Sequence, residues 1–210
     1  MDYNNLIKRT CVSFFLIILF FLLINFLEIY IPYVLILIYG VILYEVFFYI
    51  NNKKKYYFLL IFYLIVSFIC SELYFTYYYE KFIFIYFITL IACFDTFSYI
   101  FGSLFGKRKL IPRISPNKTI FGFFFGVILT LFISTIFNFY FDIFNFFKAI
   151  LFSILIIISS FIGDLIESFY KRISGIKNSS NIIPGHGGLF DRLDGFVMGV
   201  ITLFLFSYFL

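Results

Sequence analysis

Long apolar stretches separated by short polar segments run through the sequence from Cys11 to Leu210. A helix needs about 20 predominantly apolar residues to cross the hydrocarbon core of a bilayer. The stretches have this length, and charges, Pro32 and polar clusters mark their ends. The pattern predicts an all-α fold, a polytopic transmembrane helical bundle of seven spans, near residues 10–28, 31–50, 56–72, 82–105, 120–140, 147–168 and 193–210.

Composition supports a membrane protein and excludes a soluble globular domain. Hydrophobic residues make up 63% of the chain and aromatic residues 26%, which leaves too few polar residues to cover a soluble surface. The three cysteines lie in or beside apolar runs and form no CxxC pair, so neither a disulfide framework nor a zinc site is indicated. The partner of this chain is therefore the lipid bilayer, and no nucleic acid is expected.

The basic residues give the chain an orientation. In a seven-span arrangement, all but two of the 16 Lys and Arg residues fall on one side of the membrane, the exceptions being Lys81 and Lys148. Short loops rich in Lys and Arg remain in the cytoplasm. We therefore expect a cytoplasmic N-terminus and a multi-pass protein of the cell inner (plasma) membrane.

Carboxylates lie where lipid is expected. An ionisable residue inside a span costs roughly 2.5–3.5 kcal/mol on insertion scales and is by default a functional candidate. Asp164, Glu167, Ser168 and Lys171 share one helix face if the sixth helix continues that far. Asp191 and Asp194 form a second stripe at the start of the seventh helix. If the two stripes face each other, their carboxylates could hold Mg²⁺. The alternative is that these acids form ion pairs with neighbouring Lys and Arg residues.

Between the two acidic stripes, residues 183–188 read Ile-Pro-Gly-His-Gly-Gly. Glycines allow backbone N–H groups to approach an anion closely, so this loop could cradle a phosphate. An ordinary turn is the alternative, and a lone histidine such as His186 is more often a structural hydrogen-bonding residue than a catalytic one.

A second polar region begins within the fourth span at Asp95 and continues into a basic loop, residues 106–119. Five basic residues in this loop could bind a triphosphate. They could equally be a cytoplasmic anchor that contacts anionic lipid, so charge alone leaves both readings open.

These two regions resemble the phosphatidate cytidylyltransferase (CDP-diglyceride synthase) family. The first carries Asp95-Thr-x-Ser98-Tyr99-x-x-Gly102 followed by Gly106-Lys107-x-Lys109 and Ser115-Pro116-x-Lys118-Thr119. The second carries Ser168-Phe-Tyr-Lys171-Arg172, Lys177 and then Ile183-Pro184-Gly185-His186-Gly187-Gly188-Leu-Phe-Asp191-Arg192-Leu-Asp194. Together they cover about half of the chain.

The resemblance implies an enzyme, a homodimer, that transfers a cytidylyl group from CTP to phosphatidic acid at a site facing the cytoplasm. It implies N-terminal helices at 1–81 and a catalytic region at 82–210 with cytoplasmic loops 106–119 and 169–192. Mg²⁺, with a monovalent cation as a candidate second ion, is expected at Asp164, Asp191 and Asp194. The catalytic residues are expected to be Asp164, Asp191, Asp194, Lys171 and Arg172. The expected substrate-binding residues are Asp95, Ser98, Lys107, Lys109, Ser115, Lys118, Thr119, Ser168, Lys177, His186, Gly187, Gly188 and Arg192.

The chain departs from the family pattern in two places. Asn178 stands where the family usually has an acid, and residues 115–122 lack a base, a Trp and an acid of the usual segment. Two other functions remain open: a related CTP-dependent lipid kinase or a cytidylyltransferase that uses another lipid, and a non-catalytic membrane protein. Polar groups concentrated on one face of the membrane argue against a transport path, which would need them across its whole depth.

Overall fold

The computed structural model describes residues 21–22, 24–49, 54–176, 179–180, 182 and 187–209. The described chain is almost wholly helical, apart from one small hairpin. The helical elements are η1 (Glu28–Tyr30), α2 (Ile31–Tyr49), α3 (Lys54–Leu73), the π-helical turn η2 (Tyr74–Tyr78), α4 (Lys81–Phe105), α5 (Ile120–Phe141), α6 (Phe146–Ser174) and α7 (Phe190–Phe209). The hairpin strands are β1 (Lys109–Ile111) and β2 (Ser115–Thr119).

Six helices in the described part of the chain are long and apolar enough to cross a membrane. They coincide with the six predicted spans from residue 31 onward and confirm an all-α, multi-pass membrane bundle. The predicted first span, 10–28, lies almost entirely outside the described residues, so the count of seven and the orientation of the N-terminus stay predictions.

The last two helices are longer at their polar ends than the pattern predicts. Helix α6 continues beyond residue 168 to Ser174, and it ends at Gly175, whose φ of 70° is left-handed. Lys171 and Arg172 occupy its last turn, where positive charge favours the carbonyl end of a helix. Helix α7 begins at Phe190 rather than 193, so part of the predicted loop 169–192 is helical.

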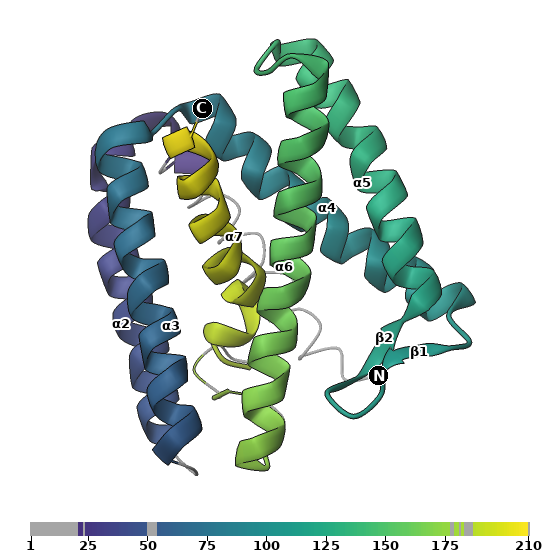
Figure 1. Ribbon diagram of the computed structural model, residues 1–210. Coiled ribbons are helices and arrows are strands. Elements are labelled where there is room, and N and C mark those ends of the chain that lie inside the picture. Colours follow the sequence, from purple (N-terminus) through teal and green to yellow (C-terminus); the bar gives the residue numbers. More distant parts are fainter. Residues whose placement is uncertain are drawn as a thin grey trace.

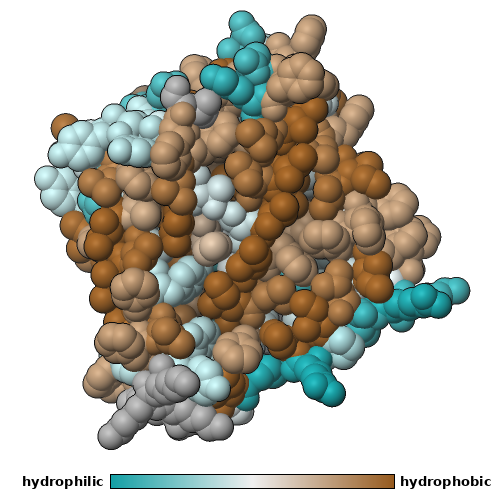
Figure 2. Space-filling view, viewed as in Figure 1, coloured by the Kyte–Doolittle hydropathy of each residue, from teal (hydrophilic) through white to brown (hydrophobic). Residues whose placement is uncertain are grey.

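Figure 1 shows how the helices are arranged around the site. Helices α2 and α3 form one side of the bundle, α5 lies on the other, α6 and α7 lie between them, and α4 crosses behind α6 toward the hairpin. The hairpin of β1 and β2 lies at the same end of the molecule as the C-terminal end of α6. In Figure 2, brown apolar side chains cover most of the visible surface between hydrophilic patches at its edges, as expected of a protein with lipid around it.

The predicted loop 106–119 contains an antiparallel hairpin. Lys109 pairs with Thr119, and Ile111 pairs with Ser115. The side chain of Thr119 then accepts a hydrogen bond from the amide of Gly122 at 3.1 Å and caps the start of α5. Two short strands thus connect the end of α4 to the next membrane helix.

Small and polar residues explain how α5 packs against its neighbours. Its buried positions recur every fourth residue: Gly122, Gly126, Thr130, Ser134 and Asn138. Small side chains at this spacing let helices approach closely where no hydrophobic effect drives them together. The hydroxyl of Ser134 lies 2.5 Å from that of Tyr86 in α4 and 2.6 Å from that of Ser153 in α6, which links three helices within the apolar layer.

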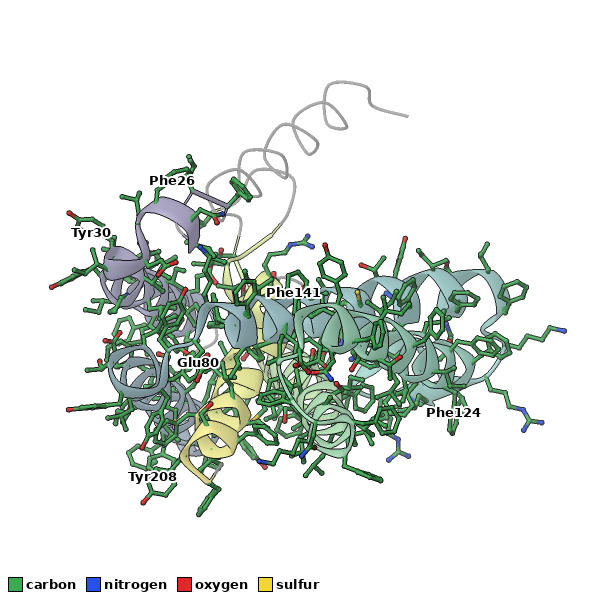
Figure 3. The ribbon with its side chains drawn as sticks, turned by 90° about the horizontal axis from the view of Figure 1, so that it is seen from above. Phe26, Tyr30, Glu80, Phe124, Phe141 and Tyr208 are labelled. Atoms are coloured by element: carbon green, nitrogen blue, oxygen red, sulfur yellow. The ribbon has the colours of Figure 1, made fainter. Side chains whose placement is uncertain are left out.

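Large aromatic side chains occupy the outer faces of the bundle. Tyr30, Phe124 and Tyr208 lie at its rim in Figure 3, and each exposes more than half of its surface. In a bilayer these faces contact lipid, so polar chemistry is confined to the interior and to the two ends.

Candidate active site

A cavity of about 520 Å³ opens between α4, the hairpin, α5 and α6. It brings together seven residues that the sequence predicts for the site: Asp95, Ser98, Lys109, Ser115, Lys118, Thr119 and Asp164. Phe94, Phe123 and Phe161 line its apolar part. The region that begins at Asp95 therefore meets Asp164 of the acidic stripe on α6 in one cavity.

Lys118 and Asp164 form the central polar contact of this cavity. The Lys118 ammonium makes an ion pair with the Asp164 carboxylate and stands 4.4 Å from the centre of the Phe161 ring. Ser168, one turn along α6, donates a longer hydrogen bond of 3.3 Å to the same carboxylate. A cation on the hairpin and an anion on α6 are thus held face to face beside an aromatic ring.

Three carboxylates meet where α6 crosses α7. Asp164, Glu167 and Asp194 each offer an oxygen, and these oxygens lie within 4.8 Å of one another. The crossing is close because residue 163 is glycine: a Cβ there would stand 2.2 Å from the carbonyl oxygen of Asp194. Glycine at this position therefore determines how near Asp194 comes to the acids of α6.

Asp191 faces a different set of partners. It accepts hydrogen bonds from the amides of Ser179 and Gly188 at 3.0 Å, and Lys171 lies 3.0 Å from it. The same ammonium is 2.6 Å from Glu167. Asp191 thus holds the segment before α7, and it is absent from the group of three acids that could share a cation.

The three acids fit a hard divalent cation. Mg²⁺ prefers oxygen ligands and is usually held by one or two carboxylates together with substrate phosphates. The set Asp164, Glu167 and Asp194 offers such oxygens beside the cavity. The sequence instead assigns the metal to Asp164, Asp191 and Asp194, so the two sets share two members and differ in the third.

Of the other predicted residues that the structure describes, none lines the cavity. Lys107 is exposed beyond the lining, and the Arg172 Nε donates to the Ile114 carbonyl at 3.2 Å, joining the end of α6 to the hairpin turn. Arg192 is exposed on the first turn of α7. Lys177 and His186 lie outside the described residues, and their roles stay predictions.

The described residues of the glycine-rich loop, Gly187 and Gly188, have structural roles. Gly187 has a φ of 85°, a conformation that glycine adopts without strain. The amide of Gly188 donates to Asp191, so that amide already has an anionic acceptor within the chain. A phosphate cradle formed by this loop stays a prediction.

Sequence reasoning assigned no role to one buried acid of this region, Glu45 of α2. Its side chain is fully buried and hydrogen-bonds to the segment that leads into α7. The available signal was an acid in the middle of an otherwise apolar span. Its partners lie more than 130 residues away along the chain, a distance at which sequence spacing gives no information.

Comparison with known proteins identifies the family of the chain. The model of the cytidylyltransferase family matches residues 56–210. The phosphatidate cytidylyltransferase of Staphylococcus haemolyticus is 50% identical over 105 residues, which are 49% of this chain and 40% of that protein. The enzymes of the same name from Staphylococcus epidermidis and Staphylococcus aureus are 45% identical over 104 residues and 47% identical over 105 residues, with the same two coverages.

The matched segment thus spans about two fifths of the length of these curated relatives. The family model covers well over half of this chain, including every described residue that lines the cavity. The chain belongs to the cytidylyltransferase family.

Proposed function

We propose that this protein transfers the cytidylyl group of CTP to phosphatidic acid, giving CDP-diacylglycerol and pyrophosphate. The observation that carries the proposal is the single cavity in which Lys118 of the hairpin meets Asp164 of α6. Phosphatidate cytidylyltransferase is also the name of the relatives described above. The position of the cavity beside lipid-facing helices suits a reaction between a water-soluble nucleotide and a membrane lipid.

The reaction joins two anions, so the main task of the protein is to position them and neutralise their charge. Lys109 and Lys118 line the cavity from the hairpin and are the cations that bind the CTP phosphates. Lys171 and Arg172 lie in the last turn of α6 and bind the phosphate of phosphatidic acid. The acyl chains remain between helices, in lipid.

A direct displacement balances without a covalent enzyme intermediate. A phosphate oxygen of phosphatidic acid forms a bond to the α-phosphorus of CTP, and the bond from that phosphorus to the β-phosphate oxygen breaks. Pyrophosphate leaves with the electron pair. The attacking phosphate is already ionised near neutral pH, so no residue has to remove its proton.

Asp164, Glu167 and Asp194 are the described residues that would hold Mg²⁺. A bound Mg²⁺ neutralises phosphate charge and orients the reacting groups. The close packing of α6 and α7 at Gly163 holds the three carboxylates near one another. Asp191 has a different role: it anchors the segment before α7 by accepting hydrogen bonds from the amides of Ser179 and Gly188.

Location and assembly are part of the proposal. The hairpin carries Lys and Arg at the same end of the bundle as the basic turn of α6, which suits a site that faces the cytoplasm from the inner membrane. Substrate access from the cytosol for CTP and from the bilayer for phosphatidic acid follows from this placement. We include a homodimer in the proposal, and its test is the mass of the purified protein in detergent.

The experiment is a transfer assay with purified, detergent-solubilised protein, α-labelled CTP, phosphatidic acid and Mg²⁺, with and without a chelator. We expect labelled CDP-diacylglycerol that disappears with the chelator and returns when Mg²⁺ is restored. Label in a different lipid product would assign the chain to another lipid substrate. Absence of any labelled lipid with folded protein would refute the proposal.

Asp164→Asn is the decisive variant, with Asp142→Asn as its matched control. Asp142 is exposed at the turn between α5 and α6, and its left-handed φ of 48° is one that Asn adopts readily. We expect Asp164→Asn to insert normally and to lose turnover, whereas Asp142→Asn retains it. Equal activities would exclude the role given to Asp164.

A further inference from the structure

Glu45 is a fully buried acid in the C-terminal half of α2, a helix otherwise built of apolar and aromatic residues. An acid in a membrane span costs free energy unless its carboxylate finds partners. It lies outside residues 56–210, to which the family model matches. Because its own helix is apolar, the groups that offset the free-energy cost of burying Glu45 have to come from other parts of the chain.

Among the described residues, four groups donate hydrogen bonds to the Glu45 carboxylate, and all of them come from the segment that leads into α7 or from its first residue, Phe190. One oxygen accepts from the Ser180 hydroxyl at 2.6 Å and from the Leu189 amide at 2.8 Å. The other accepts from the Ser179 hydroxyl at 3.1 Å and from the Phe190 amide at 2.9 Å. A single side chain of α2 thus holds both ends of this segment together.

The contact caps the N-terminus of α7. The first amides of a helix have no acceptor within the helix, and a carboxylate placed there is favoured by both hydrogen bonding and the helix dipole. Here the cap is supplied by another helix. The fit is tight, because a Cβ on Gly188 would stand 2.8 Å and 2.9 Å from the two Glu45 oxygens.

The capped turn leads directly to the acids of the site. Asp191 and Asp194 lie in the first turn and a half of α7, immediately after the two amides that Glu45 binds. Asp191 also holds this segment, through the amides of Ser179 and Gly188. The position of Asp194 relative to Asp164 therefore depends on where Glu45 fixes the beginning of α7.

From these contacts we infer that Glu45 is a positioning residue for the proposed cytidylyl transfer: it fixes the start of α7 and thereby sets Asp194 opposite the acids of α6. The inference rests on the proposed function, and it makes α2 part of the catalytic apparatus although the family model does not reach it. Glu45 itself does not touch substrate.

The test compares Glu45→Gln and Glu45→Asp with Glu28→Gln as the control. Gln has the same size as Glu but replaces one acceptor oxygen with a donor, which then faces an amide of α7. Asp keeps both oxygens and the charge on a shorter side chain. Glu28 is a partly exposed acid whose contact is an ion pair with Lys81 at the other end of the helices.

We expect Glu45→Gln to lower kcat about tenfold or more, because a charged hydrogen-bonding group is lost at a buried site, while KM for CTP stays within about twofold. Glu45→Asp is expected to recover part of kcat, and Glu28→Gln to match the unmodified protein. Amide hydrogen exchange over residues 187–192 should be faster in Glu45→Gln and unchanged in Glu28→Gln.

Each result is informative about a different claim. A normal kcat and normal exchange in Glu45→Gln would overturn the inference, and so would a fall in activity that only follows the fraction of folded protein. If the unmodified protein makes no CDP-diacylglycerol, the proposed function fails. The exchange comparison then still determines whether Glu45 fixes the start of α7.

Discussion

Gly163 of α6 and Asp194 of α7 touch through their backbones: a Cβ on residue 163 would lie only 2.2 Å from the Asp194 carbonyl oxygen and 3.0 Å from the carbonyl carbon. This contact brings the Asp194 carboxylate to the same place as Asp164 and Glu167. The close approach of two helices is therefore what assembles the acidic part of the site.

Gly163→Ala should separate the two helices and reduce turnover. The atoms in the way are backbone atoms, which cannot move aside cheaply, so we expect a loss of stability of about 1–3 kcal/mol and a fall in kcat. The measurement is thermal unfolding in detergent together with initial rates. Gly40→Ala is the control, since a Cβ at this exposed helical position meets nothing within 4 Å, and equal behaviour of the two variants would contradict the role of Gly163.

Glu167→Gln and Asp191→Asn should separate two assignments of the metal ligands. In the structure Glu167 lies with Asp164 and Asp194, whereas Asp191 contacts backbone amides and Lys171. We expect both variants to be slower, but only Glu167→Gln to raise the Mg²⁺ concentration for half-maximal rate, by about tenfold for a lost charged ligand. Initial rates over a Mg²⁺ titration measure this concentration.

The opposite pattern in that titration has a clear meaning. If Asp191→Asn raises the Mg²⁺ requirement and Glu167→Gln does not, the ligand set is the one expected from the sequence, Asp164, Asp191 and Asp194. The two variants are therefore each other's control.

Much of the fold follows from the sequence because the bilayer imposes a simple requirement of length and apolarity. The helices from Ile31 to Phe209 appear where the apolar stretches predict them. The hairpin was missed because its strands are short, and the longer of them, Ser115–Thr119, is polar and lacks alternating apolar residues. Local pattern thus predicts elements buried in lipid better than those that lie in water.

The sequence predicts which residues belong to the site, but it does not predict which of them contact each other. Helical spacing predicts that Asp164, Glu167 and Lys171 share a face of α6, and Lys171 does contact Glu167. Spacing cannot tell which acid of α7 faces which acid of α6, because that depends on the crossing at Gly163. The partners of Glu45 are further removed still, since they come from a segment more than 130 residues later.

Asn138→Ala should destabilise the bundle without affecting the chemistry. The Asn138 amide nitrogen donates to the Phe144 carbonyl at 2.8 Å and its oxygen accepts from the Phe144 amide at 2.9 Å, which closes the turn between α5 and α6. Losing both bonds should cost about 1–3 kcal/mol, seen as a lower unfolding midpoint with kcat unchanged. Thr135→Ala is the control, because that hydroxyl donates to the Phe132 carbonyl of its own helix; an equal midpoint in both variants would contradict the prediction.

Lys118→Gln should weaken the binding of CTP more than it slows the bound complex. Lys118 is the cation that lines the cavity next to Asp164 and Phe161, and a charged contact to phosphate is stronger than a neutral one. We expect KM for CTP to rise about tenfold, KM for phosphatidic acid to change little, and Lys118→Arg to restore part of the affinity. Lys148→Gln removes an exposed lysine at the other end of α6 and should leave both constants unchanged. A rise in KM for phosphatidic acid alone would instead place Lys118 on the lipid phosphate.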